Sequence, residues 1–373
     1  FMIKIELQRG TLTLQPSKDN VWQWQDLLGF AERINPKRAF LFVSKVLGRH
    51  IPVSPVIIRQ AFTDLAQQVP ANLPEPVLVI GMAETAVGLG AGVHQVLQRQ
   101  YPDALYVTTT RHPVADAPLL VRFLEEHSHA QDQLLYSSAD PEIHAQILAS
   151  KSIVLVDDEA STGKTFINLI SALQNAGLNE ISHVVTATLA DWSSGIHILG
   201  LECQSVALMT GTWQWQDAEN PKKIEMPKVD TIAFGEFEAL AQPTWGRLPV
   251  KDTTAHIRLS AQAQERILVL GSGEYVWSSF LLAEHLQQQG ADVKFSAITR
   301  SPIAEGHAIQ SGLAFSDNYG LGIQNFVYNI NPVAYDRILI TVETTKDSVA
   351  TELLAALPNA EVISAVDYPH HIS

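Results

Sequence analysis

Two adjacent carboxylates, followed by a short loop of small residues, are the part of the sequence best suited to chemistry. Asp157 and Asp158 come directly after residues 153–156, four apolar residues typical of a buried strand. Residues 161–165 read Ser-Thr-Gly-Lys-Thr, and a run with helical character follows. This arrangement can hold a phosphorylated sugar, because the acids accept hydrogen bonds from vicinal hydroxyls and amides at a helix N-terminus face a phosphate.

The same loop invites comparison with a nucleotide-binding P-loop. Gly163, Lys164 and Thr165 match the end of the motif G-x-x-x-x-G-K-[ST]. That motif requires a glycine where this chain has Asp158, and a carboxylate there would face the β-phosphate that a P-loop surrounds. A plain buried strand with a turn is the other alternative. It accounts for residues 153–156 but not for the paired acids and their loop.

The composition is that of a compact soluble protein with room for two domains. The chain has 373 residues, of which 46% are hydrophobic and 17% charged. Its single cysteine, Cys203, excludes an internal disulfide framework and fits a reducing, cytoplasmic location. No apolar run resembles a signal peptide or a membrane span. We expect Met2, which follows Phe1, to be the natural first residue.

The formal net charge of −14 argues against nucleic acid as the main partner, because such binding depends on clustered lysine and arginine. An acidic protein that binds a highly anionic substrate needs other positive charge. The usual sources are Mg²⁺, backbone amides and a few placed cations. We therefore expect Mg²⁺ as a cofactor.

Strands alternate with helical segments, which predicts an α/β fold with a doubly wound parallel sheet. The predicted strands of the first half are 77–80, 104–109, 153–156 and 184–189. Residues 112–150 show no clear periodicity and are expected to be partly loop and partly helix. Ligands of such folds bind at the carboxyl ends of the strands, where the loops after the first three strands would meet.

The periodic pattern breaks down between residues 217 and 252, where prolines stand at 221, 227, 243 and 249. This break predicts a linker or domain boundary near residues 220–250. We place the first domain at residues 1–240 and a second, smaller α/β domain at residues 241–373.

The second domain repeats the strand and loop order of the first. Residues 77–84 align with residues 267–274, and the next strands end in Thr-Arg at Arg111 and Arg300. Residues 338–345 align with the acid motif but lack the acid pair and the Thr-Gly-Lys-Thr loop. A duplication with a degenerate second copy explains the pattern. Two unrelated α/β domains built from the same strand-loop-helix units are the alternative.

Taken together, these segments resemble a bacterial phosphoribosyltransferase-like family of the type I fold. Its C-terminal TRSP domain is named after a tetrapeptide, which stands here at residues 299–302. The other segments that carry the resemblance are 33–52, 81–85, 109–111, 126–130 and 153–165. The resemblance covers nearly the whole chain. It implies an association with tellurium-resistance and stress-response genes, and with synthesis of a nucleoside-like metabolite.

The resemblance also implies an activity. A phosphoribosyltransferase of this kind moves ribose 5-phosphate from phosphoribosyl pyrophosphate (PRPP) to a base or base-like acceptor in nucleotide metabolism and releases pyrophosphate. The catalytic residues implied are Asp157, Asp158 and Arg111, and the two acids are implied to hold the Mg²⁺, directly or through water. The residues implied in PRPP binding are Asp157, Asp158, Ala160, Ser161, Thr162, Gly163, Lys164 and Thr165, with Gly81, Met82, Ala83, Glu84 and Thr85 at the pyrophosphate.

Each of these roles has a plainer alternative. Gly81 is expected to allow an unusual backbone angle that presents loop amides, but a tight turn without a ligand would look the same. Glu84 is suited either to Mg²⁺ or to capping the next helix. Arg111 is suited either to pyrophosphate or to a surface ion pair.

The acceptor and the proton acceptor stay unassigned. Purine enzymes whose loop reads Asp-Thr-Gly-Lys-Thr carry a base-contacting acid where this chain has Ser161. The candidate residues for an acceptor or anion site are Arg300, Ser301, Gly273, Glu274, His127 and His129.

Two other functions remain open. Proteins of this fold can sense PRPP without turnover, although no basic extension here points to a DNA-binding regulator. A hydrolase would need an activated water, for which His127 and Glu84 are the candidates. The expected partners are PRPP and an unidentified base-like molecule, with no nucleic acid and no membrane. A homodimer is among the assemblies that the sequence allows.

Overall fold

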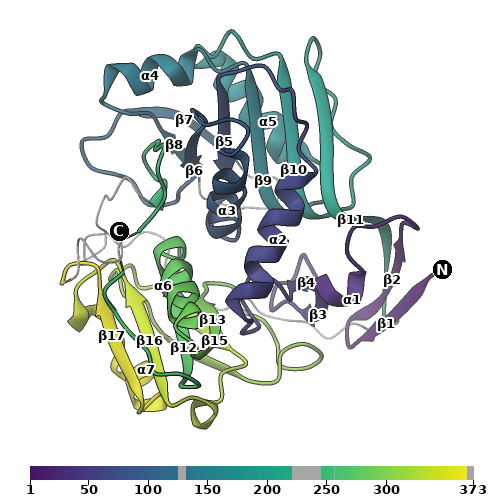
Figure 1. Cartoon of the computed structure of the whole chain (residues 1–373). Helices are drawn as coiled ribbons and strands as arrows, with labels where there is room; N and C mark the ends of the chain where they lie inside the picture. The colour runs from purple at the N-terminus through teal and green to yellow at the C-terminus, as the bar shows by residue number, and fades with distance from the viewer. Residues whose placement is uncertain (125–131, 221–244, 256, 368–373) are drawn as a thin grey trace.

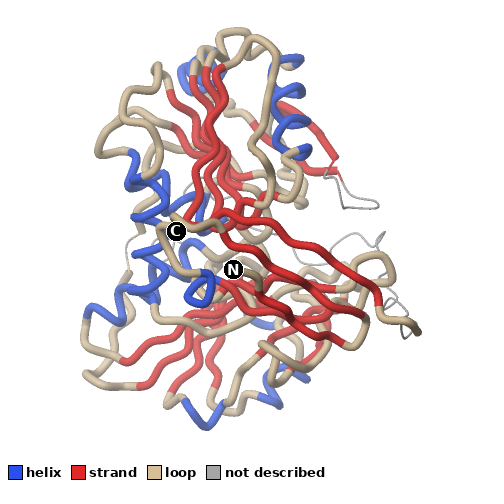
Figure 2. Tube along the Cα trace, turned by 90° about the vertical axis from the view of Figure 1, so that its right-hand side faces the viewer, coloured by secondary structure: helices blue, strands red, loops and turns tan. Residues whose placement is uncertain are grey.

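The computed structural model describes residues 1–124, 132–220, 245–255 and 257–367 of the chain. Within these ranges the polypeptide forms two main β-sheets at opposite ends of the molecule, with helices between them (Figure 1, Figure 2). Every helix in this described part is too short or too polar to span a membrane.

The first sheet contains seven strands in the order β1-β2-β11-β10-β9-β5-β6. They are β1 (Ile3–Leu7), β2 (Gly10–Pro16), β5 (Val77–Gly81), β6 (Leu105–Thr108), β9 (Ser152–Ala160), β10 (His183–Asp191) and β11 (Glu202–Asp217). From β11 to β6 the strands are parallel, while β2 pairs antiparallel with the second part of β11. The central strands β5 and β9 are largely buried apolar runs, as is typical of a parallel sheet covered on both faces.

Helices cover both faces of this sheet. The helices of the first half are α1 (Trp24–Leu27), α2 (Pro55–Gln67), α3 (Val87–Leu97), α4 (Pro141–Leu148) and α5 (Lys164–Asn175). The chain passes from β5 through α3 to β6, and from β9 through α5 to β10 on the other side. Because such crossovers are right-handed, α3 and α5 lie on opposite faces, and the sheet is doubly wound as predicted. The strand order reverses between β5 and β9, so their loops diverge and leave a crevice.

The second sheet repeats the central part of the first. Its strands, in the order β13-β12-β16-β17, are β12 (Arg266–Ser272), β13 (Asp292–Ile298), β16 (Arg337–Val342) and β17 (Ala360–Ser364). That order corresponds to β6-β5-β9-β10, and all pairs are parallel. The register agrees as well, because Leu78 pairs with Ile153 as Leu268 pairs with Ile338. This agreement favours duplication of one unit. The remaining helices are α6 (Trp277–Gln288), α7 (Thr351–Ala356) and the 3-10 turns η2 (Pro332–Ala334) and η3 (Lys346–Ser348).

Three antiparallel hairpins complete the described fold. They are β3 (Leu28–Glu32) with β4 (Phe40–Ser44), β7 (Leu119–Leu124) with β8 (Asp132–Tyr136), and β14 (Gly312–Ser316) with β15 (Gln324–Tyr328). The region 112–150, expected to be loop and helix, therefore contains two strands before α4. Only Val121 and Phe123 of β7 are buried, while Leu119 and Leu124 are exposed. Because apolar residues also occupy the exposed face of β7, its sequence lacks the alternation of apolar and polar residues that predicts a strand.

The two halves pack on each other through α2, α3 and α6. Arg59 of α2 donates to both carboxylate oxygens of Glu284 on α6, at 2.8 Å each. The second half also extends the first sheet, because Tyr106 N of β6 donates to Val250 O at 2.8 Å. The predicted domain boundary at residue 240 falls in 221–244, outside the described residues.

Candidate functional site

A pocket of about 460 Å³ opens at the carboxyl ends of β5 and β9, within the size range of small-molecule sites. Its walls come from four parts of the chain: residues 157–166, residues 83–85 with Arg111, residues 33–50, and residues 299–302. The first two parts contain most of the residues predicted to bind PRPP. The last part is the tetrapeptide of the second half, so both halves of the chain line one pocket.

The paired acids lie in the last part of β9. Asp157 and Asp158 both line the pocket, and Asp158 N donates to Asp157 Oδ1 at 2.8 Å. The sequence predicts that the strand ends at these acids, but β9 continues to Ala160. The reason is that β10 continues to pair with it, with Asp191 opposite Ala160. The acids are therefore held by a sheet rather than by a loop.

A third acid of this strand, Glu159, also lines the pocket. Its side chain is 17% exposed, and Oε1 lies 3.8 Å from Arg38 Nη2. Burial raises the pKa of Glu159 to about 7, against the opposing effect of Arg38. Near neutral pH the pocket therefore contains a carboxyl group that is partly protonated.

The loop after β9 is shaped by one glycine. Gly163 stands at the N-cap position of α5 with φ of 84°, a backbone conformation that favours glycine. A Cβ at this position would lie 2.5 Å from Ile196 Cγ2, so the space also excludes a side chain. The residues of this loop that line the pocket are Ala160, Ser161, Gly163 and Thr165, while Thr162 and Lys164 lie outside the lining.

Gly81 at the end of β5 is required for a different reason from the predicted one. Its φ is not positive, so the backbone at Gly81 does not adopt the left-handed conformation that favours glycine. A Cβ at Gly81 would instead lie 2.8 Å from both Ala86 O and Tyr106 Oη, and close packing therefore requires glycine. Gly81 and Met82 lie beneath the pocket, and the residues of this loop that line it are Ala83, Glu84 and Thr85.

Two amides of the loop after β5 are available to a ligand. Met82 N donates to the β9 backbone at 2.9 Å, and Ala83 N donates to Thr109 Oγ1 at 2.8 Å. The amides of Glu84 and Thr85 have no acceptor within the described part of the chain. Glu84 and Thr85 are therefore the residues of this loop whose amides can bind an anion.

Arg49 offsets the negative charge of Glu84 in this loop. Its Nη1 donates to Glu84 Oε1 at 3.0 Å, and its Nη2 donates to Glu84 O at 2.9 Å. Nη1 also lies 3.0 and 3.1 Å from the carbonyl oxygens of Gly273 and Ile298. One buried arginine thus joins the loop after β5 to its counterpart in the second half.

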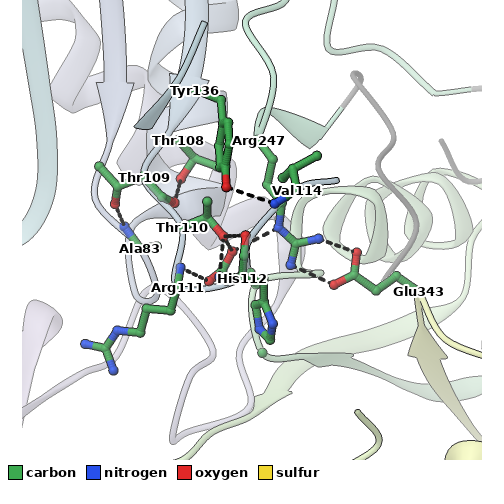
Figure 3. A network of polar contacts seen from close by, with 12 residues as sticks. Ala83, Thr108, Thr109, Thr110, Arg111, His112, Val114, Tyr136, Arg247 and Glu343 are labelled. Carbon is green, nitrogen blue, oxygen red and sulfur yellow. Dashed lines mark hydrogen bonds and ion pairs between the residues drawn. The ribbon is translucent and has the colours of Figure 1, made fainter. Parts of the chain in front are cut away.

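Glu274, a carboxylate of the second half, fixes the end of β6 at Thr110 and Arg111, two residues labelled in Figure 3. Thr110 Oγ1 donates to Glu274 Oε1 at 2.6 Å, and Arg111 N donates to Glu274 Oε2 at 2.9 Å. Burial alone would raise the pKa of Glu274, but Arg247, His112 and these hydrogen bonds lower it to about 2. The charged carboxylate therefore holds the backbone from which the Arg111 side chain extends to the pocket.

The tetrapeptide brings Arg300 and Ser301 to the same pocket. Arg300 follows β13 as Arg111 follows β6, and its Nη2 lies 3.3 Å from His112 Nε2. Burial, with the nearby arginines and against the effect of Glu274, lowers the pKa of His112 to about 3. The neutral imidazole can therefore accept a hydrogen bond from Arg300. Equivalent arginines of the two halves thus line one pocket.

Gly273 and Glu274, also predicted for an acceptor or anion site, do not line the main pocket. They border an adjoining cavity of about 10 Å³, which shares Glu84, Arg111 and Arg300 with the main pocket and has room for one water molecule at most. His127 and His129 fall outside the described residues. Of the six candidates, the structure brings Arg300 and Ser301 to the main pocket.

In the second half, the position equivalent to the acid pair is filled by the protein itself. Glu343, the counterpart of Asp158, is fully buried. Arg247 donates to both of its carboxylate oxygens, at 2.7 and 2.8 Å, and Tyr319 Oη also donates to it. Arg247 Nε binds Glu274 at 3.1 Å, so this arginine lies between the two loops that correspond to the pocket loops of the first half (Figure 3).

Several residues of these two sites are not among the sequence predictions. They are Arg33, Arg38, Phe42, Arg49, His50, Glu159 and Arg247. The missed residues of the segment 33–50 could have been found from the sequence, because several cations there flank an apolar strand pattern. No local signal exists for Arg247, because its segment has no periodicity and its partners lie far away in sequence.

Comparisons with known proteins agree with the motifs. A family model described as phosphoribosyl transferase matches residues 27–212, and that of the TRSP domain found C-terminal to it matches residues 245–357. Curated proteins give no match to this sequence.

Solved structures of phosphoribosyltransferases are similar at low identity. Adenine phosphoribosyltransferase from Rhodothermus marinus is 16% identical, with a TM-score of 0.32 over 48% of this chain and 93% of that chain. Adenine phosphoribosyltransferase from Trypanosoma brucei, in complex with AMP, pyrophosphate and ribose-5-phosphate, is 12% identical, with a TM-score of 0.37 over 55% of this chain and 86% of that chain. Orotate phosphoribosyltransferase from Aeropyrum pernix is 18% identical, with a TM-score of 0.26 over 45% of this chain and 80% of that chain.

The family assignment rests on the two family matches, which together span most of the chain in the order that the motifs predict. The chain therefore belongs to the phosphoribosyl transferase family and carries, C-terminal to that domain, a TRSP domain.

Proposed function

We propose that this protein transfers ribose 5-phosphate from PRPP to a nitrogen of a base-like acceptor and releases pyrophosphate. The observation that carries the proposal is the pair Asp157 and Asp158, which a central strand presents to a pocket of substrate size. The chain's membership of a phosphoribosyl transferase family supports the same reaction class.

In the proposed complex, the three parts of PRPP meet three parts of the pocket. The ribose hydroxyls bind the carboxylates of Asp157 and Asp158, which are hydrogen-bond acceptors. The 5′-phosphate binds the backbone of residues 160–165 at the N-terminus of α5, where the helix dipole favours an anion. The pyrophosphate binds the amides of Glu84 and Thr85, with Arg111 beside them.

Mg²⁺ fits this arrangement as a substrate-bound ion. It prefers oxygen ligands, keeps several waters, and usually binds one or two carboxylates together with substrate phosphates. Within the described ranges, no group of three His, Cys, Asp or Glu side chains forms a metal cage. The two carboxylates Asp157 and Asp158 suit a site that the substrate completes. When bound, Mg²⁺ would neutralise part of the pyrophosphate charge.

The chemistry is a displacement at C1 of the ribose. The acceptor nitrogen gives its lone pair to C1, the bond from C1 to the pyrophosphate oxygen breaks, and pyrophosphate leaves with that electron pair. The nitrogen then loses its proton. Positive charge on the ribose is stabilised by the nearby carboxylates, and negative charge on the leaving group by Arg111 and the loop amides, both placed in advance by the fold.

Pyrophosphate release tests the proposal. Purified protein with PRPP and Mg²⁺ is given a panel of nitrogen bases and a metabolite extract, and free pyrophosphate is measured. We expect release that depends on an acceptor and on Mg²⁺. A protein that binds PRPP tightly but releases no pyrophosphate with any acceptor would instead be a PRPP sensor, and the proposed transferase activity would be wrong.

A further inference from the structure

One wall of the pocket remains when PRPP is placed as proposed, and this inference rests on that proposed function. The acids, the phosphate loop and the pyrophosphate loop occupy residues 157–165 and 83–85. Part of the remaining lining is formed by Arg33, Leu41, Phe42, His50 and residues 299–302, which we name the acceptor wall. A second substrate has to contact these residues if it is to share the pocket with PRPP.

The acceptor wall is one unit built from both halves of the chain. Ile34 N donates to Pro302 O at 3.1 Å, and Ala304 N donates to Glu32 O at 2.9 Å. Behind these hydrogen bonds lies a buried apolar cluster of Ala31, Leu41, Val43, Ile303, Ile309 and Tyr328. The tetrapeptide is therefore fixed on the β3–β4 hairpin and cannot move independently of it.

Arg33 is a cation on this wall that forms no ion pair within the described part of the chain, although Glu159 and Asp158 are near enough to raise its pKa. Its Nε is buried, and its guanidinium makes no hydrogen bond or ion pair with the described part of the chain. Burial and the neighbouring Arg38 lower the pKa of Arg33 to about 10, which leaves it charged at neutral pH. The nearest acids are engaged otherwise: Glu159 lies beside Arg38, and Asp158 faces the ribose in the proposed complex. A partly buried cation of this kind is costly unless an anion binds it.

His50 is a second group without a partner. It is 7% exposed, and neither ring nitrogen has a hydrogen-bond partner among the described residues. Burial, with Arg49 and Arg33 nearby, lowers the pKa of His50 to about 3. The neutral imidazole therefore offers one donor and one acceptor beside Arg33. Buried polar atoms without partners are rare in proteins, and those on a pocket wall are suited to a ligand.

The apolar members of the wall indicate the shape of that ligand. The Phe42 ring lines the pocket and is stacked on Trp192 at 4.8 Å between ring centres, which holds it rigidly. Aromatic rings pack on one another in stacked or edge-to-face arrangements, so a rigid ring on the wall favours a planar ring in the ligand. We propose that the acceptor is a planar nitrogen heterocycle that carries a carboxylate or similar anionic group, which Arg33 binds while His50 hydrogen-bonds to the ring or its substituent.

Matched acidic and neutral probes test this proposal by titration calorimetry on the full chain. The probes are nicotinate against nicotinamide and orotate against uracil, added with Mg²⁺, ribose 5-phosphate and pyrophosphate so that no transfer occurs. The acid of each pair is expected to bind about tenfold more tightly, the effect of one charge-assisted interaction. Arg33→Gln should remove the difference, Arg33→Lys should retain part of it, and His50→Phe should weaken both members of a pair.

A separate titration with PRPP and Mg²⁺ distinguishes failure of the acidic acceptor from failure of the proposed function. Arg33→Gln should bind PRPP within about twofold of the wild type, which also shows that the variant folds. If Arg33→Gln loses PRPP affinity, Arg33 serves a phosphate of PRPP and the acidic acceptor is wrong. Equal binding of the acidic and the neutral probe of each pair, or no binding of either acid while PRPP binds, would also overturn it. A wild-type chain that does not bind PRPP overturns the proposed function, and this inference with it.

Discussion

The guanidinium of Arg247 donates to both carboxylate oxygens of Glu343, at 2.7 and 2.8 Å, in a position fully shielded from solvent. The same guanidinium binds Glu274 at 3.1 Å. Glu274 in turn holds the end of β6, from which Arg111 reaches the pocket. The filled site of the second half is thus connected by direct bonds to the open site of the first.

Arg247→Met should therefore destabilise the protein strongly. The substitution leaves two buried carboxylates without their cation, and breaking a buried pair in this way costs roughly 3–5 kcal/mol. The free energy of unfolding, measured by urea titration, is expected to fall by that amount. Arg266→Met is the matched control, because Arg266 binds Asp336 at a similar 2.8 Å but both side chains are about half exposed. An equal decrease in the free energy of unfolding for the two substitutions would show that the buried ion pairs of Arg247 stabilise the protein no more than an exposed pair does.

The charge of Glu274 predicts a dependence of stability on pH. Its pKa in the folded protein is about 2, below the ordinary value of 4.5, so folding favours the ionised form. The stabilisation is therefore complete above about pH 4.5 and is lost as the pH falls toward 2. Its full size is on the order of 3 kcal/mol. The difference in free energy of unfolding between wild type and Glu274→Gln should shrink as the pH is lowered from 6 to 3, and a constant difference would contradict the assignment.

Gly163→Ala should damage the phosphate loop. The substitution places a Cβ at φ of 84°, where a left-handed backbone costs an L-residue roughly 1–2 kcal/mol, and 2.5 Å from Ile196 Cγ2. We expect lower stability and a PRPP affinity reduced at least about tenfold, since 1.4 kcal/mol corresponds to a factor of ten. Gly200→Ala is the control, because Gly200 has φ of 81° with open space around it. If both variants bind PRPP equally weakly, the crowding at Ile196 is irrelevant to the site.

The parallel sheet and its main loops could be predicted from sequence because they depend on local patterns. Runs such as residues 153–156 are apolar enough to be buried on both faces, and small residues mark the loops after them. The end of β9 could not be predicted, because pairing with β10 carries the strand through three polar residues to Ala160. The strand β7 was hidden for a related reason, since its exposed leucines resemble buried ones in sequence.

The candidate site likewise has a part that local sequence patterns predict and a part that they do not. Asp157, Asp158 and the Ser-Thr-Gly-Lys-Thr loop lie on one strand-loop-helix unit, so their spacing shows them directly. The acceptor wall is made by residues of two distant segments, which only the packing of the two halves brings together. The role of Arg247 depends on partners at Glu274 and Glu343, and no local pattern marks such a long-range pair.

The central claim is that Asp157 and Asp158 form the floor of a PRPP site, and titration calorimetry with PRPP in the presence and absence of Mg²⁺ tests it most directly. The wild type is expected to bind PRPP with Mg²⁺ and much more weakly without it. Asp157→Asn/Asp158→Asn should lose at least about a hundredfold in affinity, because two hydrogen-bonding charges are removed. Asp19→Asn, at an exposed residue after β2, should bind as the wild type does. Absence of PRPP binding by the wild type with Mg²⁺, or undiminished binding by the double variant, would contradict the account.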